Sequence, residues 1–255
     1  MTEPLSATTA LITGASSGIG EATAVALARE GARVALVARR RERLDDLSAR
    51  ITDSGGSALI LDTDVSVEAK AREAVARTVD QLGRLDILIN NAGVMLLGRV
   101  EGADTSQWRQ MLDINVAALM TLTHAALPHL LEAADSEPRH LADIVNVSSV
   151  AGRVARRGSA AYNASKWAVN AFSEALRQEV TTRHVRVGLV EPGAVDTELA
   201  SHNTDPEVVA GMQQRFGSIE RMTAEDIAEV IVFMVTRPRR VALNEVLVRP
   251  TEQAD

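Results

Sequence analysis

Short apolar runs alternate with longer amphipathic segments along the whole chain, and this alternation limits the possible folds more than any other feature. A parallel sheet needs this order, because a crossover helix must return the chain to the same end of the sheet after each strand. The apolar runs are continuous, as in strands that are covered on both faces. The sequence therefore predicts a doubly wound α/β fold, with a seven-stranded parallel sheet and helices on both faces.

The predicted strands are residues 10–13, 33–37, 57–61, 86–90, 143–148, 185–190 and 244–248. Helices are predicted near 18–30, 40–53, 66–82, 104–131, 161–182 and 223–236. Residues 193–220 form an irregular region with a short helix around 206–216. Long excursions at the carboxyl end of a strand commonly cover a ligand, so 193–220 is the expected substrate lid. Residues 250–255 are expected to be a frayed tail.

The length and composition fit one soluble domain, residues 1–255, because a chain of this size can bury one large core. Cysteine is absent, which excludes disulfides and thiolate zinc sites and suits a reducing compartment, so we expect the cytoplasm. We expect no metal site. The N-terminal segment carries Glu3 where a secretory signal needs positive charge, and no apolar run reaches the roughly 18 residues needed to span a bilayer. No membrane partner is therefore expected.

Charge and aromatic content argue against a nucleic-acid partner. The formal net charge is -7, whereas a nucleic-acid-binding surface needs a basic domain or stripe. The chain has only two Trp, one Tyr and three Phe, so few aromatic side chains are available to stack on bases. A small molecule is the expected partner.

A glycine-rich turn, "TGASSGIG" from Thr13 to Gly20, follows the first predicted strand and opens the first helix. Gly14 permits a tight turn, Gly18 lets the backbone approach an anion at the helix N-terminus, and Gly20 allows close packing of helix on strand. The alternative is ordinary turn chemistry. A triphosphate-binding loop is excluded, because no Lys-Ser/Thr pair ends the turn.

In dinucleotide-binding folds, the residue at the end of the second strand selects the cofactor. An acidic residue there favours NAD, and a basic residue favours NADP. The sequence here reads Ala38, Arg39, Arg40 and Arg41, and arginines at a helix start oppose the helix dipole. We infer the 2′-phosphate of NADP(H), with Arg39 as the best ligand because a guanidinium offers a planar, forked set of donors. NAD(H) is less favoured. The alternative is a solvated basic turn paired with the aspartates at 45 and 46.

The stretch "YNASK" holds the only tyrosine of the chain, Tyr162, four residues before Lys166, one of two lysines. On a helix this spacing places both side chains on one face. A neighbouring ammonium favours the phenolate, so we expect the pKa of Tyr162 to be lowered toward the working range of an acid–base catalyst. The alternative is a surface helix with an accidental spacing. Ser149 ends the fifth predicted strand, where its hydroxyl could polarise a substrate oxygen.

Seven motifs in order resemble the short-chain dehydrogenase/reductase family, and the resemblance covers residues 8 to 249. They are "TGASSGIG", "DTDV" (62–65), "NNAG" (90–93), Asn115 in "DINV", Ser149, "YNASK" and "EPG" (191–193). The resemblance implies a Rossmann fold and an NADP(H)-dependent oxidoreductase that interconverts a carbonyl and an alcohol by hydride transfer. It also implies catalytic roles for Tyr162 as general acid/base, Lys166, Ser149, and Asn115 as the holder of a relay water.

The implied cofactor-binding residues gather at the carboxyl ends of the predicted strands. They are Gly14, Ser16, Ser17, Gly18, Ile19, Gly20, Arg39, Arg40, Asp64, Val65, Asn91, Ala92, Gly93, Tyr162, Lys166, Pro192, Gly193, Val195 and Thr197. The expected substrate residues are Met95, Ser149, Arg153, Tyr162 and Leu199, with an apolar wall at 94–97. Arg153, with the arginines at 156 and 157, could attract a carboxylate. The alternatives are core packing for the wall and solvated surface arginines.

The helices predicted at 104–131 and 161–182 are apolar around more of their circumference than one packed face needs. An exposed apolar face of this kind predicts self-association, as a homodimer or homotetramer. Two other functions stay open: a non-catalytic NADP(H)-sensing regulator, and a non-redox epimerase or dehydratase on the same fold.

Overall fold

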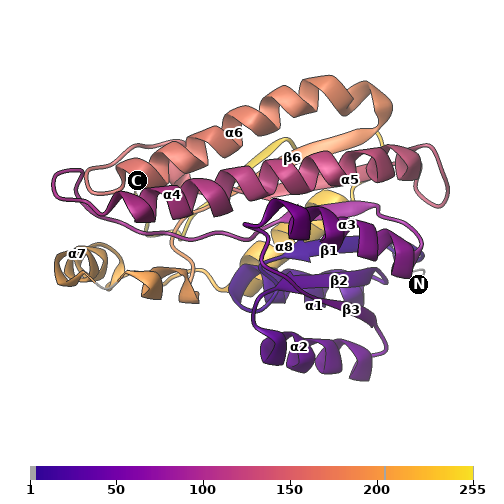
Figure 1. The fold of residues 1–255 in the computed structure, drawn as a ribbon, viewed down its shortest axis with the longest axis horizontal. Coiled ribbons are helices and arrows are strands. Elements are labelled where there is room, and N and C mark those ends of the chain that lie inside the picture. The colour runs from indigo at the N-terminus through magenta and orange to yellow at the C-terminus, as the bar shows by residue number, and fades with distance from the viewer. Residues whose placement is uncertain (1–3, 204, 255) are drawn as a thin grey trace.

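The computed structural model describes residues 4–203 and 205–254, and its centre is one parallel sheet of seven strands (Figure 1). The strands are β1 (Thr9–Thr13), β2 (Arg33–Ala38), β3 (Ser57–Asp62), β4 (Ile87–Asn90), β5 (Ala142–Val147), β6 (Val185–Pro192) and β7 (Glu245–Val248). Their order across the sheet is β3-β2-β1-β4-β5-β6-β7. The order reverses between β1 and β4, and the predicted doubly wound Rossmann fold is confirmed.

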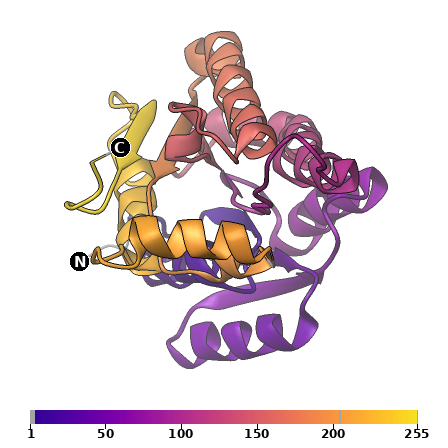
Figure 2. The same ribbon diagram turned by 90° about the vertical axis from the view of Figure 1, so that its left-hand side faces the viewer.

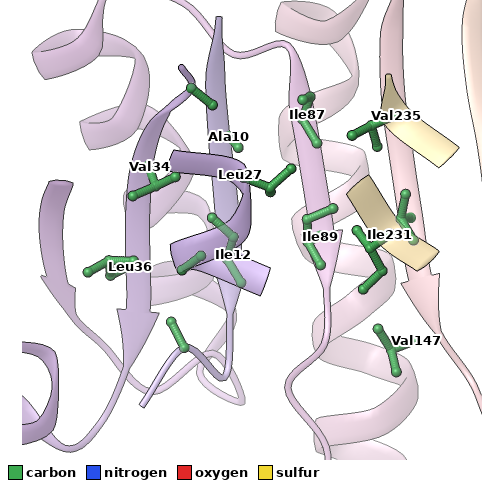
Figure 3. Packing of buried hydrophobic residues seen from close by; sticks show 14 of the residues in the cluster. Ala10, Ile12, Leu27, Val34, Leu36, Ile87, Ile89, Val147, Ile231 and Val235 are labelled. Atoms are coloured by element: carbon green, nitrogen blue, oxygen red, sulfur yellow. The ribbon is translucent and has the colours of Figure 1, made fainter. Parts of the chain in front are cut away.

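Helices cover both faces of the sheet. They are α1 (Gly18–Arg29), α2 (Arg41–Asp53) and α8 (Ala224–Val235) on one face, and α3 (Glu68–Leu82), α5 (Leu119–Ala134) and α6 (Ala160–Val180) on the other. Successive strand residues point to opposite faces, so Ile12 packs against α1 and α8 while Leu11 packs beneath α3 and α5. Figure 3 shows the first of these layers, where Leu27 of α1 and Ile231 of α8 meet the strands.

The helix predicted at 104–131 is one continuous helix from Thr105 to Ala134 with a change of winding inside it. The segment α4 (Thr105–Leu112) is followed by a π-helical segment, η1 (Asp113–Ala118), and then by α5. Asp104 starts the helix, because its side chain accepts a hydrogen bond from the backbone N–H of Ser106. A π-segment inside an α-helix often marks a functional position, and this one carries Asn115.

By length and composition alone, the helix Thr105–Ala134 could cross a membrane, with a mean hydropathy of 1.3 over its best window. The expectation that no apolar segment is long enough is therefore wrong as stated. The core helix of a soluble protein meets the same criterion, and Leu122, Ala126 and Leu130 of this helix are buried against the sheet.

The region after β6 departs from the sheet before the chain returns in α8. It contains η4 (Glu198–His202) and α7 (Pro206–Phe216), close to the predicted short helix. Figure 2 faces the end of the molecule where α7 lies. The predicted frayed tail is wrong for residues 250–254: the backbone N–H of Gln253 donates to the carbonyl of Pro250 at 2.9 Å, and its side chain bonds to the loop after β6.

Candidate active site

A cleft of about 1120 Å³ opens at the carboxyl ends of the strands, beneath the region after β6. This is where open α/β sheets bind ligands, since the strand order reverses between β1 and β4. Most of the predicted site residues line it. The three exceptions among them are Gly20, Asn115 and Arg153.

The glycine turn is shaped by close approaches that no other residue would permit. Gly14 and Gly18 have φ of +66° and +55°, the left-handed region that favours glycine. A Cβ on Gly14 would lie 2.8 Å from Nδ2 of Asn91, and one on Gly20 would run into the Gly14 carbonyl. Gly20 thus has the packing role predicted for it, without lining the cleft.

The N-terminus of α1 opens into the same cleft. Its N-cap, Ser17, makes no side-chain cap hydrogen bond. The first backbone N–H groups of a helix have no partner within the helix, and the helix dipole favours an anion beside them. The turn can therefore bind a phosphate.

The two arginines after β2 differ in what they contact. Arg40 donates to Oγ of Ser17 at 2.6 Å and to Oγ of Ser16 at 3.1 Å, and its Nη1 pairs with Glu198 at 2.7 Å. This bond holds the pKa of the Glu198 carboxyl below its usual range. Arg39 is exposed and lines the cleft.

The expected alternative for these arginines was a pairing with the aspartates that follow. That pairing is present for Arg41, which pairs with Asp45 one turn later on α2 at 2.9 Å, whereas Arg40 pairs with Glu198. Arg39 lines the cleft, and Arg40 ties the glycine turn to η4 in the region after β6. A ligand phosphate at this edge would meet two cations.

Asn115 joins the π-segment to the loop after β4 rather than lining the cleft. Its Oδ1 accepts from the backbone N–H of Val94 at 2.8 Å, and its Nδ2 donates to the Val94 carbonyl at 2.9 Å and to Oγ of Ser165 at 3.1 Å. The side chain is buried. These contacts hold the loop at Gly93 beside α6, and the relay water implied by the resemblance stays a prediction.

Tyr162 and Lys166 lie on the face of α6 that turns toward the cleft, and both side chains are 6% exposed. The Nζ of Lys166 donates to the carbonyl of Val147 at 2.9 Å and lies 5.9 Å from the centroid of the Tyr162 ring. The phenol is hydrogen-bonded to Ser149. The expected shared face is therefore present, and the pair is not on the protein surface.

The pKa values of the pair differ from the expectation. Burial raises the pKa of Tyr162 to about 12, and the hydrogen bond with Ser149 opposes this only in part. Burial lowers the pKa of Lys166 to about 8. The expected lowering of the Tyr162 pKa by Lys166 is wrong for this structure, because desolvation of the phenolate outweighs any help from the amine. Tyr162 is therefore a neutral hydroxyl at pH 7 and a potential proton donor.

Ser149 places a second hydroxyl beside the phenol. It is the N-cap of η2 (Val150–Gly152), where its Oγ accepts from the backbone N–H of Ala151 at 3.1 Å. The same Oγ lies 3.5 Å from the carbonyl of Pro192, to which it donates. Since Tyr162 is hydrogen-bonded to Ser149, the two hydroxyls can converge on one ligand oxygen.

Arg153, predicted to contact substrate, is not brought to the cleft. Its guanidinium donates to both carboxylate oxygens of Glu191 at 2.7 and 2.9 Å and also pairs with Glu245. Glu191 at the end of β6 is fully buried, and a buried carboxylate needs a bound cation. The sequence analysis named Glu191 only as part of "EPG" and did not predict this ion pair.

The substrate side of the cleft has an apolar wall, and the other predicted substrate residues lie there. Met95 and Leu199 line the cleft, and so do the arginines at 156 and 157. Asn203 ties the region after β6 to this wall, because its side chain donates to the Met95 carbonyl at 3.0 Å and accepts from the Leu97 N–H at 2.7 Å. The sequence offered no signal for Asn203, nor for Trp108 and Gln253, which also line the cleft.

Among the described residues, no group of three or more His, Asp and Glu side chains could hold a metal ion. His124 lies 3.2 Å from the guanidinium of Arg72, and His202 lines the cleft.

Comparisons with known proteins agree with this geometry. A family model described as short chain dehydrogenase matches residues 8–208. An uncharacterized oxidoreductase of Listeria innocua is 35% identical over 245 residues, 95% of this chain and 96% of the relative. Glycine betaine reductase of Emericella nidulans is 36% identical over 250 residues, but the chain spans only 19% of its length.

A solved structure of a metagenomic short-chain oxidoreductase in complex with NADP is similar to this fold throughout. The TM-score is 0.80 at 32% sequence identity, and the match covers 97% of this chain and 99% of that chain. The sheet order, the glycine turn and the matches together settle the family. The chain belongs to the short-chain dehydrogenase family of oxidoreductases.

Proposed function

We propose that the protein is an NADP(H)-dependent oxidoreductase that interconverts a carbonyl and an alcohol, with Tyr162 as general acid/base. The observation that carries the proposal is the placement of the Tyr162 and Ser149 hydroxyls next to each other in a cleft whose other end is the glycine turn. Two hydroxyls can bind one carbonyl oxygen there and supply a proton to it.

A nicotinamide cofactor held by the glycine turn and Arg39 would supply the hydride for the carbonyl carbon in the direction of reduction. The Ser149 hydroxyl donates a hydrogen bond to the carbonyl oxygen and polarises the double bond. Tyr162 gives its proton to the same oxygen as the alcohol forms. The phenol carries its proton at neutral pH, so the proton is available for this step.

Lys166 has a supporting part in the proposed reaction. Its amine is held by the Val147 carbonyl one helical turn from Tyr162. At neutral pH it is largely protonated, so it favours the phenolate left after proton transfer.

The preference for NADP(H) over NAD(H) rests on Arg39 and Arg40. Both line the cleft after β2, where a 2′-phosphate would need cations. The similar metagenomic structure is a complex with NADP, which supports the same cofactor in this chain. Arg40 would exchange or share its bond to Glu198 when such a phosphate binds, whereas Arg39 has its guanidinium available.

The experiment is a screen of aldehydes, ketones and secondary alcohols that follows the absorbance of the reduced cofactor, with wild-type protein and the Tyr162→Phe variant. Wild type should consume NADPH in equal amount to the alcohol formed. Tyr162→Phe should lose about 10²-fold or more in turnover, because the proton donor is gone. Its fold, by circular dichroism, and its NADPH affinity should stay unchanged.

Three outcomes separate the proposal from its rivals. NADPH binding without turnover on any carbonyl would favour the sensing regulator. Product formation without net cofactor consumption would favour an epimerase or dehydratase. Undiminished reductase activity in Tyr162→Phe would contradict the role of the phenol.

Self-association through the face formed by α4, α5 and α6 is part of the proposal. Leu112 on α4, Met120 on α5 and Trp167 on α6 are 47%, 43% and 50% exposed, and α4 packs beside α6. A second copy that covers this face would give a homodimer or homotetramer. The proposal also includes a small-molecule substrate and a location in the cytoplasm. The location rests on the absence of cysteine, which suits a reducing compartment.

A further inference from the structure

The chain after β7 folds back toward the cleft instead of leaving the molecule. The backbone N–H of Gln253 bonds to the Pro250 carbonyl at 2.9 Å, which closes a turn. This turn places Gln253 among the residues that line the cleft. The segment Pro250–Ala254 is called the tail below.

The tail lies directly on the loop that leaves β6. Oε1 of Gln253 accepts a hydrogen bond from the backbone N–H of Ala194 at 2.9 Å. A Cβ on Gly193 would run into that Oε1 and would lie 3.2 Å from Cδ of Pro250. Gly193 does not have a positive φ. The need for glycine at this position is therefore explained by the tail packed over it and not by the backbone conformation.

A second contact joins the tail to the far end of the lid. Oε2 of Glu252 accepts from the backbone N–H of Glu220 at 3.1 Å. Glu220 is the last residue of the region expected to cover the substrate. Neighbouring residues of the tail therefore hold two backbone amides that are far apart along the chain, one near each end of the lid.

The two stems of the lid meet between these contacts. Val195 and Met222 form an isolated parallel bridge. The N–H of Asp196 donates to the Met222 carbonyl at 2.8 Å, and the N–H of Met222 donates to the Ala194 carbonyl at 3.1 Å. The base of the lid is thus a narrow two-stranded neck, and the tail bonds to both strands at or next to the neck.

We propose that the tail is a staple that fixes the base of the lid, with Gln253 as a positioning residue for the cleft. Without the amide oxygen of Gln253, the Ala194 N–H loses its acceptor and the loop Pro192–Ala194 loses the side chain packed over Gly193. The neck then opens more often, and the wall that carries Thr197 and Leu199 moves with it. What the lid covers rests on the proposed function, but the staple itself does not.

The test is hydrogen–deuterium exchange on the cofactor-free protein, read by mass spectrometry in peptides over 193–197 and 218–222. In Gln253→Ala, exchange in the first peptide should be about fivefold faster, since a net hydrogen bond of ordinary strength is lost. In Gln253→Glu the acceptor oxygen is kept, so protection should return. The matched control is Gln214→Ala on the exposed side of α7, which does not line the cleft; it should exchange as wild type.

The second test measures steady-state kinetics with NADPH and a carbonyl compound that the protein reduces. Gln253→Ala should raise the KM values about fivefold, the factor that corresponds to the loss of one such hydrogen bond. The change in kcat should be smaller, because part of the binding free energy of the ligands is then used to close the neck. Glu252→Ala should raise exchange in the peptide over 218–222 first. Gln253→Glu should restore KM toward wild type.

Two results would overturn the staple. One is unchanged exchange at 193–197 in folded Gln253→Ala. The other is faster exchange throughout the protein, including β1, which would show loss of general stability rather than an open neck. If wild type shows no turnover at all, the proposed function fails while the exchange data still decide the staple.

Discussion

Raising the pH from 8 to 10 removes the positive charge of Lys166, which the folded chain buries beside a carbonyl rather than a carboxylate. Burial lowers the pKa of this amine from its usual 10.5 to about 8. Between these two values the unfolded chain binds the proton more tightly than the folded chain does. Stability should therefore rise with pH through this window, the reverse of the effect of a lysine that gains an acidic partner.

The size of the effect follows from the two pKa values. The whole shift corresponds to about 3 kcal/mol, and about 2 kcal/mol of it should appear in the free energy of unfolding between pH 8 and 10. Tyr162 sets the upper limit of the window. Its pKa is raised from 10.0 to about 12, so the folded state keeps that proton longer, and this contribution to stability begins to fall above pH 10.

Because of the composition, few other side chains change their charge in this pH range. The chain has no cysteine, one tyrosine and two lysines, and Lys70 is exposed. Urea unfolding followed by circular dichroism at pH 8, 9 and 10 measures the effect, with Lys166→Met as the variant that lacks the amine. The free energy of unfolding of wild type should rise by about 2 kcal/mol relative to this variant across the range.

A direct titration supports the same measurement. With ¹³C-labelled lysine, the protein gives two Cε signals, and the one that is missing from Lys166→Met should move near pH 8. The same pH dependence of stability in wild type and Lys166→Met, together with a Lys166 signal that does not move near pH 8, would refute the reasoning.

Two further predictions concern the cofactor and the assembly. Arg39→Ala should raise the KM for NADPH about tenfold or more, through loss of a charge-assisted bond, and leave the KM for NADH unchanged; equal losses for both cofactors would contradict a 2′-phosphate contact. Met120→Glu should convert the wild-type oligomer to a monomer by light scattering, while Val209→Glu on α7, equally apolar and 45% exposed, should keep the wild-type mass. A monomeric wild type would contradict the assembly itself.

The sequence by itself determined the sheet and the composition of the cleft. Short continuous apolar runs are typical of strands that are covered on both faces, and their regular alternation with helices favours the parallel order. Parallel strands bring their carboxyl ends to one edge, so Gly14, Arg39, Ser149 and Tyr162 were predicted to lie together, and all four line the cleft. The spacing of Tyr162 and Lys166 needed only the period of a helix.

Only the tertiary structure decided what depends on burial and on contacts between distant segments. The spacing of Tyr162 and Lys166 suggested a lowered phenol pKa, but the depth of the site raises it, because the cost of a desolvated charge is invisible in a sequence. Arg153 read as a ligand for substrate until the fold placed a buried Glu191 beside it. Gln253 read as part of a frayed tail until the chain brought its side chain to Ala194, 59 residues away along the sequence.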